Sequence, residues 1–191
     1  MRAVIKWTTV VIVAAVIAAL SIVAVFKFTR SSFNVKNGKW ETNLNSGSPD
    51  ADMYTRALVA MFGLFALNKS ETVYFHTSVD NNGNDLTSEC DYVIKGKNLD
   101  CRWWSITAYG ADRFLIPNIY NIYAKSKKNI KYESDGTYRI KISPEFRNGN
   151  WIPIGKKGNF RLHLRLYNPS QTIYDTISSI ELPKVYREKC K

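Results

Sequence analysis

The sequence predicts a mainly β fold: a jelly-roll-like antiparallel β-sandwich with one N-terminal helix, preceded by a single transmembrane helix. Three observations lead to this fold class. A long apolar run fills residues 7–26, and an amphipathic helical pattern follows it. After that, about seven short segments of alternating apolar and polar residues are separated by turn residues at intervals of about ten. The expected organisation is a cytoplasmic tail (1–6), an anchor (7–26), a stalk (27–47) and a β-sandwich domain (48–191).

The apolar run is long enough to cross a bilayer. A helix of about twenty residues rises roughly 30 Å, which matches the hydrocarbon thickness of a membrane. Arg2 and Lys6 precede the run, and Lys27 and Arg30 follow it. The short basic tail favours a cytoplasmic start. The predicted location is therefore the cytoplasmic (inner) membrane, with the C-terminal domain exported to the periplasmic side.

A cleaved signal peptide is the alternative explanation of this run. Signal peptides have apolar cores of up to about 15 residues, followed by small residues at the cleavage site. The run in this chain is longer and ends in Val25-Phe26-Lys27-Phe28, which is a poor cleavage site. Alanines inside the run would supply an earlier site. An uncleaved signal-anchor is the favoured interpretation, and cleavage stays open.

The chain is strongly basic, with 27 Lys and Arg against 16 Asp and Glu and a net charge of +11. Four basic residues and no acidic ones precede residue 31, so the remainder carries +7. A positive domain suits an anionic partner such as a headgroup surface or an acidic polymer. The densest basic patch comprises Lys125, Lys127, Lys128 and Lys131, and it predicts either such an anionic-surface contact or a solvated loop. No nucleic-acid partner is expected, because no recognised nucleic-acid-binding module is present.

The cysteines suggest one disulfide bond. Cys90 and Cys101 lie on either side of Gly96, in what the pattern predicts to be two antiparallel strands. Residues equidistant from a hairpin turn face each other, so a Cys90–Cys101 bond is predicted for an exported domain, with three unpaired thiols as the alternative. Cys190 is then left over. With two histidines and no Cys-x-x-Cys motif, neither a metal site nor a cofactor is expected.

The amphipathic helix is expected to begin at Ser48, which is a good N-cap, with Pro49 at the first helical position. It is expected to end near Leu67. Its apolar stripe recurs at helical spacing: Tyr54, Leu58, Met61 and Phe65.

The rest of the domain is predicted to be strands, including residues 72–79, 92–94, 103–109, 119–124, 138–142 and 160–167. In the last of these, Phe160 and three leucines alternate with Arg161, His163, Arg165 and Tyr167. Adjacent strand residues point to opposite faces, so either Trp103 or Trp104 is expected in the core and the other outside. Residues 150–153 are expected to form a loop that plugs one end of the sandwich.

A series of motifs resembles a known family. In chain order they are Asp52-x-Tyr54-x-Arg56-Ala57, Tyr74-x5-Asp80-x-x-Gly83-x-x-Leu86, Trp103-Trp104-Ser105-x-Thr107-x-Tyr109, Pro117-Asn118, Ser134-Asp135-Gly136, Asn150-Trp151-Ile152-Pro153 and Arg165-Leu166-Tyr167-x-Pro169. Over residues 50–187, their order and spacing resemble the bacterial family catalogued as domain of unknown function 1214. The resemblance implies a β-sandwich, and it implies no agreed reaction, cofactor or catalytic residue.

Members of this family often follow a companion domain, domain of unknown function 1254. In this chain an anchor and a stalk stand in its place. The resemblance therefore implies a short, membrane-anchored form that works with a companion-domain envelope protein supplied as a separate polypeptide.

The ligand-binding candidates are polar and aromatic residues outside the predicted core: Trp104, Tyr109, Asp80, Asp135, His163, Arg165 and Tyr167. An arginine with aromatic and histidine neighbours can bind a carboxylate or phosphate through two hydrogen bonds. An outward Trp and Tyr109 can stack on a sugar ring, and Asp80 or Asp135 can act as an acid or base. Both aspartates also occur in turn sequences, where Asp binds local backbone amides.

Three hypotheses about function follow. The favoured one is a non-catalytic, membrane-anchored binding or assembly module that works with a companion-domain protein. The alternatives are a carbohydrate-active or other hydrolytic enzyme, and a module that binds anionic lipid or acidic polymer. The sequence has no nucleophile elbow, phosphate-binding loop or zinc signature, so the non-enzymatic hypothesis is preferred.

Overall fold

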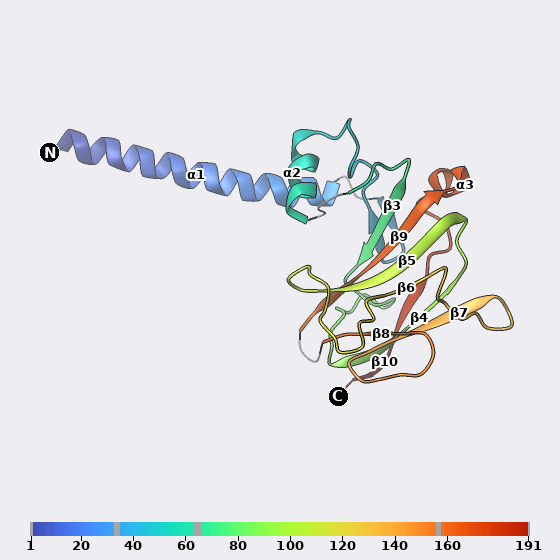
Figure 1. Ribbon diagram of the computed structural model, residues 1–191. Helices are drawn as coiled ribbons and strands as arrows, with labels where there is room; N and C mark the ends of the chain where they lie inside the picture. Colours follow the sequence, from blue (N-terminus) through green and yellow to red (C-terminus); the bar gives the residue numbers. More distant parts are fainter. Residues whose placement is uncertain (1, 33–34, 63–65, 156–157, 191) are drawn as a thin grey trace.

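The computed structural model describes residues 2–32, 35–62, 66–155 and 158–190 (Figure 1). Helix α1 (Arg2–Ser32) projects from a domain built of two β-sheets. Within α1, the span Val4–Ala24 is long and apolar enough to cross a membrane, and none of it is buried against the described chain. The described residues also form helix α2 (Met53–Phe62) and the short helix α3 (Gln171–Asp175).

The larger sheet has six strands in the order β1-β2-β3-β9-β5-β6, and every pairing is antiparallel. Its strands are β1 (Val35–Asn37), β2 (Trp40–Thr42), β3 (Thr72–Thr77), β9 (Phe160–Pro169), β5 (Cys101–Gly110) and β6 (Ala124–Ser126). The long strand β9 lies in the interior of the sheet, between β3 and β5. Its register sets Leu164 opposite both Phe75 and Ile106.

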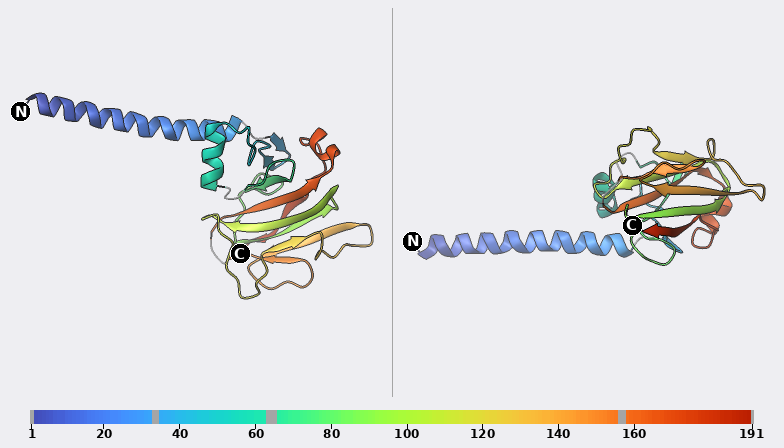
Figure 2. Two further views of the ribbon diagram at one scale, coloured as in Figure 1. Left: turned by 45° about the horizontal axis from the view of Figure 1, so that its top comes forward. Right: turned by 90° about the horizontal axis from the view of Figure 1, so that it is seen from below.

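The smaller sheet has four strands in the order β10-β4-β7-β8. They are β10 (Lys184–Cys190), β4 (Cys90–Lys97), β7 (Thr137–Ser143) and β8 (Trp151–Pro153). Strands β7 and β8 are parallel, and the other pairs are antiparallel. Figure 2 shows the two sheets as layers, with α2 on the outer side of the larger one.

The two sheets enclose one apolar core. In β9 the even-numbered residues from Phe160 to Leu166 are buried, whereas the odd-numbered ones from Arg161 to Tyr167 are partly exposed on the outer face, as the alternation predicts. The facing strands of the smaller sheet contribute Ile94, Ile140 and Ile142, all fully buried. Each such Leu or Ile side chain stabilises the fold by roughly 1.5–3 kcal/mol, so the interface between the sheets holds the domain together.

Helix α2 begins after Asp52 and not after Ser48. The Asp52 carboxylate accepts hydrogen bonds from the backbone N–H groups of Tyr54 (2.9 Å) and Thr55 (3.1 Å), which are donors that a helix start leaves without partners. The Ser48 hydroxyl instead accepts from Asp50 N–H in the preceding turn. Residues 66–68 are not helical, and residues 63–65, which the predicted helix included, lie outside the described residues.

Three further segments differ from the sequence prediction. Strands β1 and β2 lie inside the expected stalk, where Trp40 is buried and its indole N–H donates to Pro183 O (2.7 Å). Of the predicted strand 119–124, only Ala124 is in a strand. Trp151 belongs to strand β8 and not to a plugging loop; it is buried, and its indole N–H donates to Ser143 O (3.1 Å).

The predicted Cys90–Cys101 disulfide is wrong. Cys90 is bonded to Cys190, which stands opposite it in the β4–β10 pairing, and Cys101 is a buried free thiol. The prediction assumed that β4 and β5 form a hairpin, but β4 belongs to the smaller sheet and β5 to the larger one. Burial raises the pKa of the Cys101 thiol to about 11, so it stays protonated at neutral pH.

The predicted fold class is confirmed. The chain is mainly β, with two sheets dominated by antiparallel pairing and a long apolar helix at the N-terminal end.

Candidate functional site

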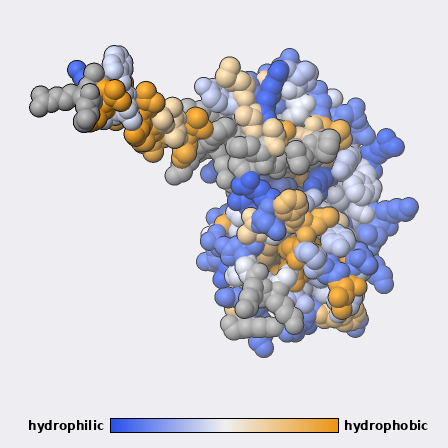
Figure 3. Space-filling model, turned by 60° about the vertical axis from the view of Figure 1, so that its left-hand side comes forward, coloured by the Kyte–Doolittle hydropathy of each residue, from blue (hydrophilic) through white to orange (hydrophobic). Residues whose placement is uncertain are grey.

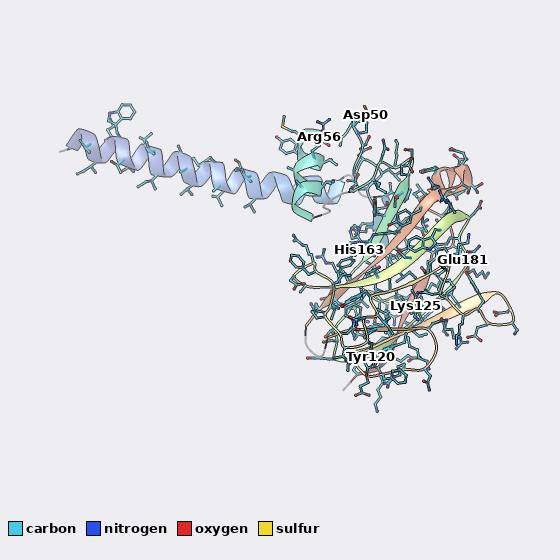
Figure 4. The ribbon with its side chains drawn as sticks, viewed as in Figure 1. Asp50, Arg56, Tyr120, Lys125, His163 and Glu181 are labelled. Atoms are coloured by element: carbon cyan, nitrogen blue, oxygen red, sulfur yellow. A yellow bond between two sulfur atoms is a disulfide. The ribbon has the colours of Figure 1, made fainter. Side chains whose placement is uncertain are left out.

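On the outer face of the larger sheet, four neighbouring strands place polar side chains in one row. The register sets Glu41 of β2 opposite His76 of β3, His76 opposite His163 of β9, and His163 opposite Thr107 of β5. His76 Nε2 lies 3.8 Å from a Glu41 carboxylate oxygen. The two imidazole rings stack with their centroids 6.0 Å apart. Figure 4 labels His163 on this face.

Arg165, the next outward residue along β9, is held in place by two hydroxyl groups. Its Nη1 donates to Thr107 Oγ1 (3.3 Å) and its Nη2 to the Tyr109 hydroxyl (2.7 Å). Its guanidinium carbon lies 5.4 Å from the centroid of the Tyr109 ring, within cation–π range. In the part of the chain that the structure describes, no carboxylate pairs with it. A guanidinium has five N–H donors, so donors remain for an anionic ligand.

His163 is neutral at physiological pH. Burial lowers its pKa to about 3, and the charges of His76, Arg165 and Arg161 act in the same direction. An edge-on contact with the Tyr109 ring, at 4.9 Å between centroids, fixes its orientation. A neutral imidazole offers one donor and one acceptor but no charge. On the outer side of β9, the positive charge therefore comes from Arg161 and Arg165.

Trp104 cannot stack on a ligand, because it is fully buried. Its indole N–H donates to Asn98 Oδ1 (3.1 Å), and its ring stacks on Tyr138 at 5.0 Å. Trp103 is the outward member of the pair, and it packs edge-on against Tyr167 with centroids 5.0 Å apart. The aromatic part of the outer face is thus Trp103 with Tyr167.

Asp80 is a structural carboxylate in the turn after β3. It is 1% exposed, accepts from the backbone N–H groups of Asn82 and Asn84 (both 2.9 Å), and pairs with Arg187 Nε of β10 at 3.2 Å. Burial alone would raise its pKa, but the hydrogen bonds from Asn84 and Asn82 and the charge of Arg187 hold that pKa below its usual range. These contacts direct Asp80 to the smaller sheet, away from Arg165.

Asp135 lies in the exposed turn before β7. It accepts hydrogen bonds from the backbone N–H (2.9 Å) and the hydroxyl (2.6 Å) of Thr137, and these bonds lower its pKa. Neither predicted aspartate is therefore brought together with Tyr109, His163 and Arg165.

The four predicted lysines form a surface around β6, but they are not equivalent. Lys127 donates its ammonium group to the backbone oxygen of Cys101 (2.7 Å), which fixes its side chain. Burial, and then the charge of Lys131, lower the pKa of Lys125. Lys128 and Lys131 are exposed. Across the described ranges, no group of three or more His, Cys, Asp or Glu is arranged to hold a metal ion.

Sequence reasoning missed Glu41, His76, Thr107 and Trp103 as members of this face. The alternation over residues 72–79 could have placed His76 on the outer face, because His76 shares the polar side of that strand with Tyr74. Ile106 and Ala108 lie on the same side of β5 as Trp104, and their apolar side chains indicate that Trp104 points into the core.

Comparison with solved structures finds the same fold in the VPA0106 protein from Vibrio parahaemolyticus. The TM-score is 0.61 at 27% identity, over 73% of this chain and 36% of the Vibrio chain. An uncharacterized protein from Burkholderia cenocepacia gives a TM-score of 0.45 at 16% identity, over 78% of this chain and 46% of that one. No curated protein matches this sequence.

The family profile described as "Protein of unknown function (DUF1214)" matches residues 71–171, which run from the start of β3 to the start of α3. The match covers more than half of the chain and includes β9 and β5, the strands that carry Arg165 and Tyr109. The protein therefore belongs to the DUF1214 family.

Proposed function

We propose that this protein is a single-pass membrane protein of the bacterial envelope whose β domain is a non-catalytic binding or assembly module on the exported side of the cytoplasmic membrane. The observation that carries the proposal is the isolation of α1, in which no residue of Val4–Ala24 is buried. A helix in the core of a soluble domain buries an apolar face. Figure 3 shows apolar side chains uncovered along this helix, and an uncovered apolar surface of this length supports its placement in lipid.

The Cys90–Cys190 bond supports an exported domain, because disulfides persist in oxidising compartments and are rare in the cytosol. A cleaved signal sequence remains the competing interpretation of α1, and it predicts the same disulfide. Cleavage and export must therefore be measured separately.

The test is to express the full chain in a Gram-negative host and to determine its intact mass, its resistance to alkaline carbonate extraction and its thiol content. We expect an uncleaved mass, retention in the membrane pellet and, because Cys101 is buried, one alkylatable thiol in denatured protein before reduction but three after it. A mature mass that lacks α1 would contradict the anchor. Three alkylatable thiols before reduction would contradict export.

The length of the Vibrio relative supports an assembly role. This chain covers only 36% of that protein, so most of the relative lies outside the shared part. In our proposal, a companion-domain envelope protein contacts this domain as a separate polypeptide. We expect a protein of that type to co-purify after gentle solubilisation of membranes, and recovery of the monomer alone would count against the assembly role.

The outer face of the larger sheet is the binding surface in this proposal. Arg165 is oriented by Thr107 and Tyr109, and its charge is available for a carboxylate or phosphate group. The Trp103–Tyr167 pair lies beside it and offers an apolar surface for the rest of the ligand.

The ligand hypothesis is tested by thermal shift of the detergent-solubilised protein with citrate, inorganic phosphate and an acidic oligosaccharide, because binding raises the apparent Tm. We expect Arg165→Gln to weaken binding roughly 10- to 100-fold, the equivalent of one lost charged hydrogen-bond partner. Arg165→Lys should not restore it, since lysine lacks the planar fork. Arg139→Gln, an exposed arginine of the smaller sheet, is the matched control. Equal effects of Arg165→Gln and Arg139→Gln would refute this site.

The two alternatives receive less support. The hydrolase hypothesis relied on Asp80 or Asp135 as acid or base, and both carboxylates are engaged in turns away from Arg165. The hypothesis of a module that binds anionic lipid or acidic polymer relied on the four lysines, and the ammonium group of one of them, Lys127, is bonded to a backbone oxygen.

A further inference from the structure

The loop that follows β5 presents apolar side chains to the surroundings. Phe114 is 71% exposed, Leu115 is 42% exposed and Ile119, a little further along, is 88% exposed. Single exposed apolar residues are ordinary on a protein surface. Phe114 and Leu115 are adjacent at the tip of the loop, whereas Ile119 adjoins Tyr120, which packs on Trp151 of β8. The apolar tip therefore consists of Phe114 and Leu115, and neighbouring exposed apolar side chains mark contact sites.

This loop is closed by its own hydrogen bonds. Gly110 N–H donates to Phe114 O (3.0 Å), Arg113 N–H donates to Gly110 O (2.9 Å), and Phe114 N–H donates to the Asp112 carboxylate (3.0 Å). Leu115 forms an antiparallel bridge with Tyr109. The backbone at the tip therefore has internal partners, which is the condition for a loop to enter an apolar environment without a large penalty.

The same loop lies on the side of the domain from which α1 projects. In Figures 1 and 2, this loop and α2 are the parts of the domain that reach furthest toward the N-terminal end of α1. Figure 3, which brings that side forward, shows apolar side chains among polar ones on this face. At the start of α2, Met53 and Tyr54 are 73% and 45% exposed.

The length of α1 places this face close to lipid if α1 is an anchor. The helix continues without a break from Ala24, the end of the apolar span, to Ser32. Those eight residues rise only about 12 Å, of which one headgroup layer takes up about 5–7.5 Å. The domain is thus held against the membrane surface and not extended away from it.

We propose that the tip of this loop, residues 111–115 with Phe114 foremost, inserts into the interfacial layer of the bilayer that α1 crosses. This inference rests on the proposed membrane anchor and adds a second contact, through which the domain is oriented on the membrane. The occupant is lipid, because the chain's own anchor brings the bilayer to this face. Aromatic side chains are favoured at this depth of a membrane.

The test is a depth measurement on the full chain in vesicles of phosphatidylethanolamine and phosphatidylglycerol. A nitroxide label is attached at Leu115→Cys, and at Ser134→Cys as the control. Ser134 is exposed in the turn before β7. That turn lies at the end of the domain remote from α1 (Figure 1). The native cysteines give little background, since Cys90 and Cys190 are bonded and Cys101 is buried. The parent protein without an added cysteine, treated with the same nitroxide reagent, measures the remaining background labelling.

We expect the label at position 115 to collide with oxygen, relative to a water-soluble nickel chelate, several-fold more often than the label at 134. Adding Phe114→Ser to Leu115→Cys should lower that ratio. Equal ratios at 115 and 134 in protein that floats with the vesicles would overturn the loop contact alone. Protein that does not float would overturn the anchor and the loop contact together. A ratio that rises with protein density in the vesicles would show self-association and would also overturn it.

Discussion

His163 is neutral in the folded protein because of its position on β9. Burial, and then the charges of His76 and two arginines, lower its pKa from 6.5 to about 3. Between these two pH values the unfolded chain binds a proton that the folded chain does not bind. Its contribution to stability is therefore complete above about pH 6.5 and is lost as the pH falls toward about 3.

We expect the Tm of the detergent-solubilised protein to fall between about pH 7 and about pH 4.5, with a smaller fall in His163→Gln. One proton accounts for at most about 1.4 kcal/mol of unfolding free energy per pH unit. His76→Gln is the control. Burial lowers the pKa of His163 more than the charge of His76 does, so the fall of the Tm with decreasing pH should largely persist in this variant. Identical slopes in the parent and His163→Gln would contradict this account.

At the scale of single residues, the sequence predicted those side chains whose strand had a clear alternation. Arg165, His163 and Tyr167 were placed correctly on the outer face because the buried residues of β9 fix its parity. The place of Glu41 on the outer face could not be predicted from the sequence. Strand β2 is only three residues long and lies in a polar segment that shows no alternation of apolar and polar residues. The pairing of Arg165 with Tyr109 required the β5–β9 register, which alternation alone does not specify.

At the scale of elements, strands were predictable and their partners were not. The sequence marked β4 and β5 as consecutive strands, and consecutive strands commonly pair. In the structure they belong to different layers, so Cys90 meets Cys190 and not Cys101. Turn residues report where a strand ends, but they do not report which sheet the next strand joins.

The Cys90–Cys190 bond fastens β10 to β4 across a sequence separation of 100. Chain-entropy arguments assign a loop of this length up to about 4.7 kcal/mol, and observed effects are typically about 2–4 kcal/mol. We expect Cys190→Ser to lower stability by about 2–4 kcal/mol and to abolish the response of the Tm to a reductant. The measurement is thermal unfolding with and without the reductant.

Cys101→Ala provides the matched control for that experiment. Its thiol is buried and unpaired, so this variant should keep the full response to the reductant. A response that persists in Cys190→Ser would show that the bond does not carry the effect.

At the scale of the whole molecule, α1 and the domain are expected to be energetically independent, because no residue of Val4–Ala24 is buried. Val13→Lys places a charge near the centre of the span, which costs about 2.5–3.5 kcal/mol for membrane insertion. We expect reduced retention in the membrane fraction and an unchanged Tm of the domain. Trp7→Lys, near the end of the span, should cost less because lysine reaches the interface. A Tm that falls with Val13→Lys would show that α1 packs on the domain.

The interior position of β9 has a consequence for the timing of folding. Phe75 and Ile106 are both aligned with Leu164, so β3 and β5 emerge during synthesis long before their shared neighbour exists. Until residues 160–169 arrive, each strand has an open edge exposed to pairing with other chains. The larger sheet must then form late, through contacts distant in sequence, which is a slow step. If the domain is exported, the interval before β9 arrives is when the nascent chain depends most on chaperones and is most open to proteases.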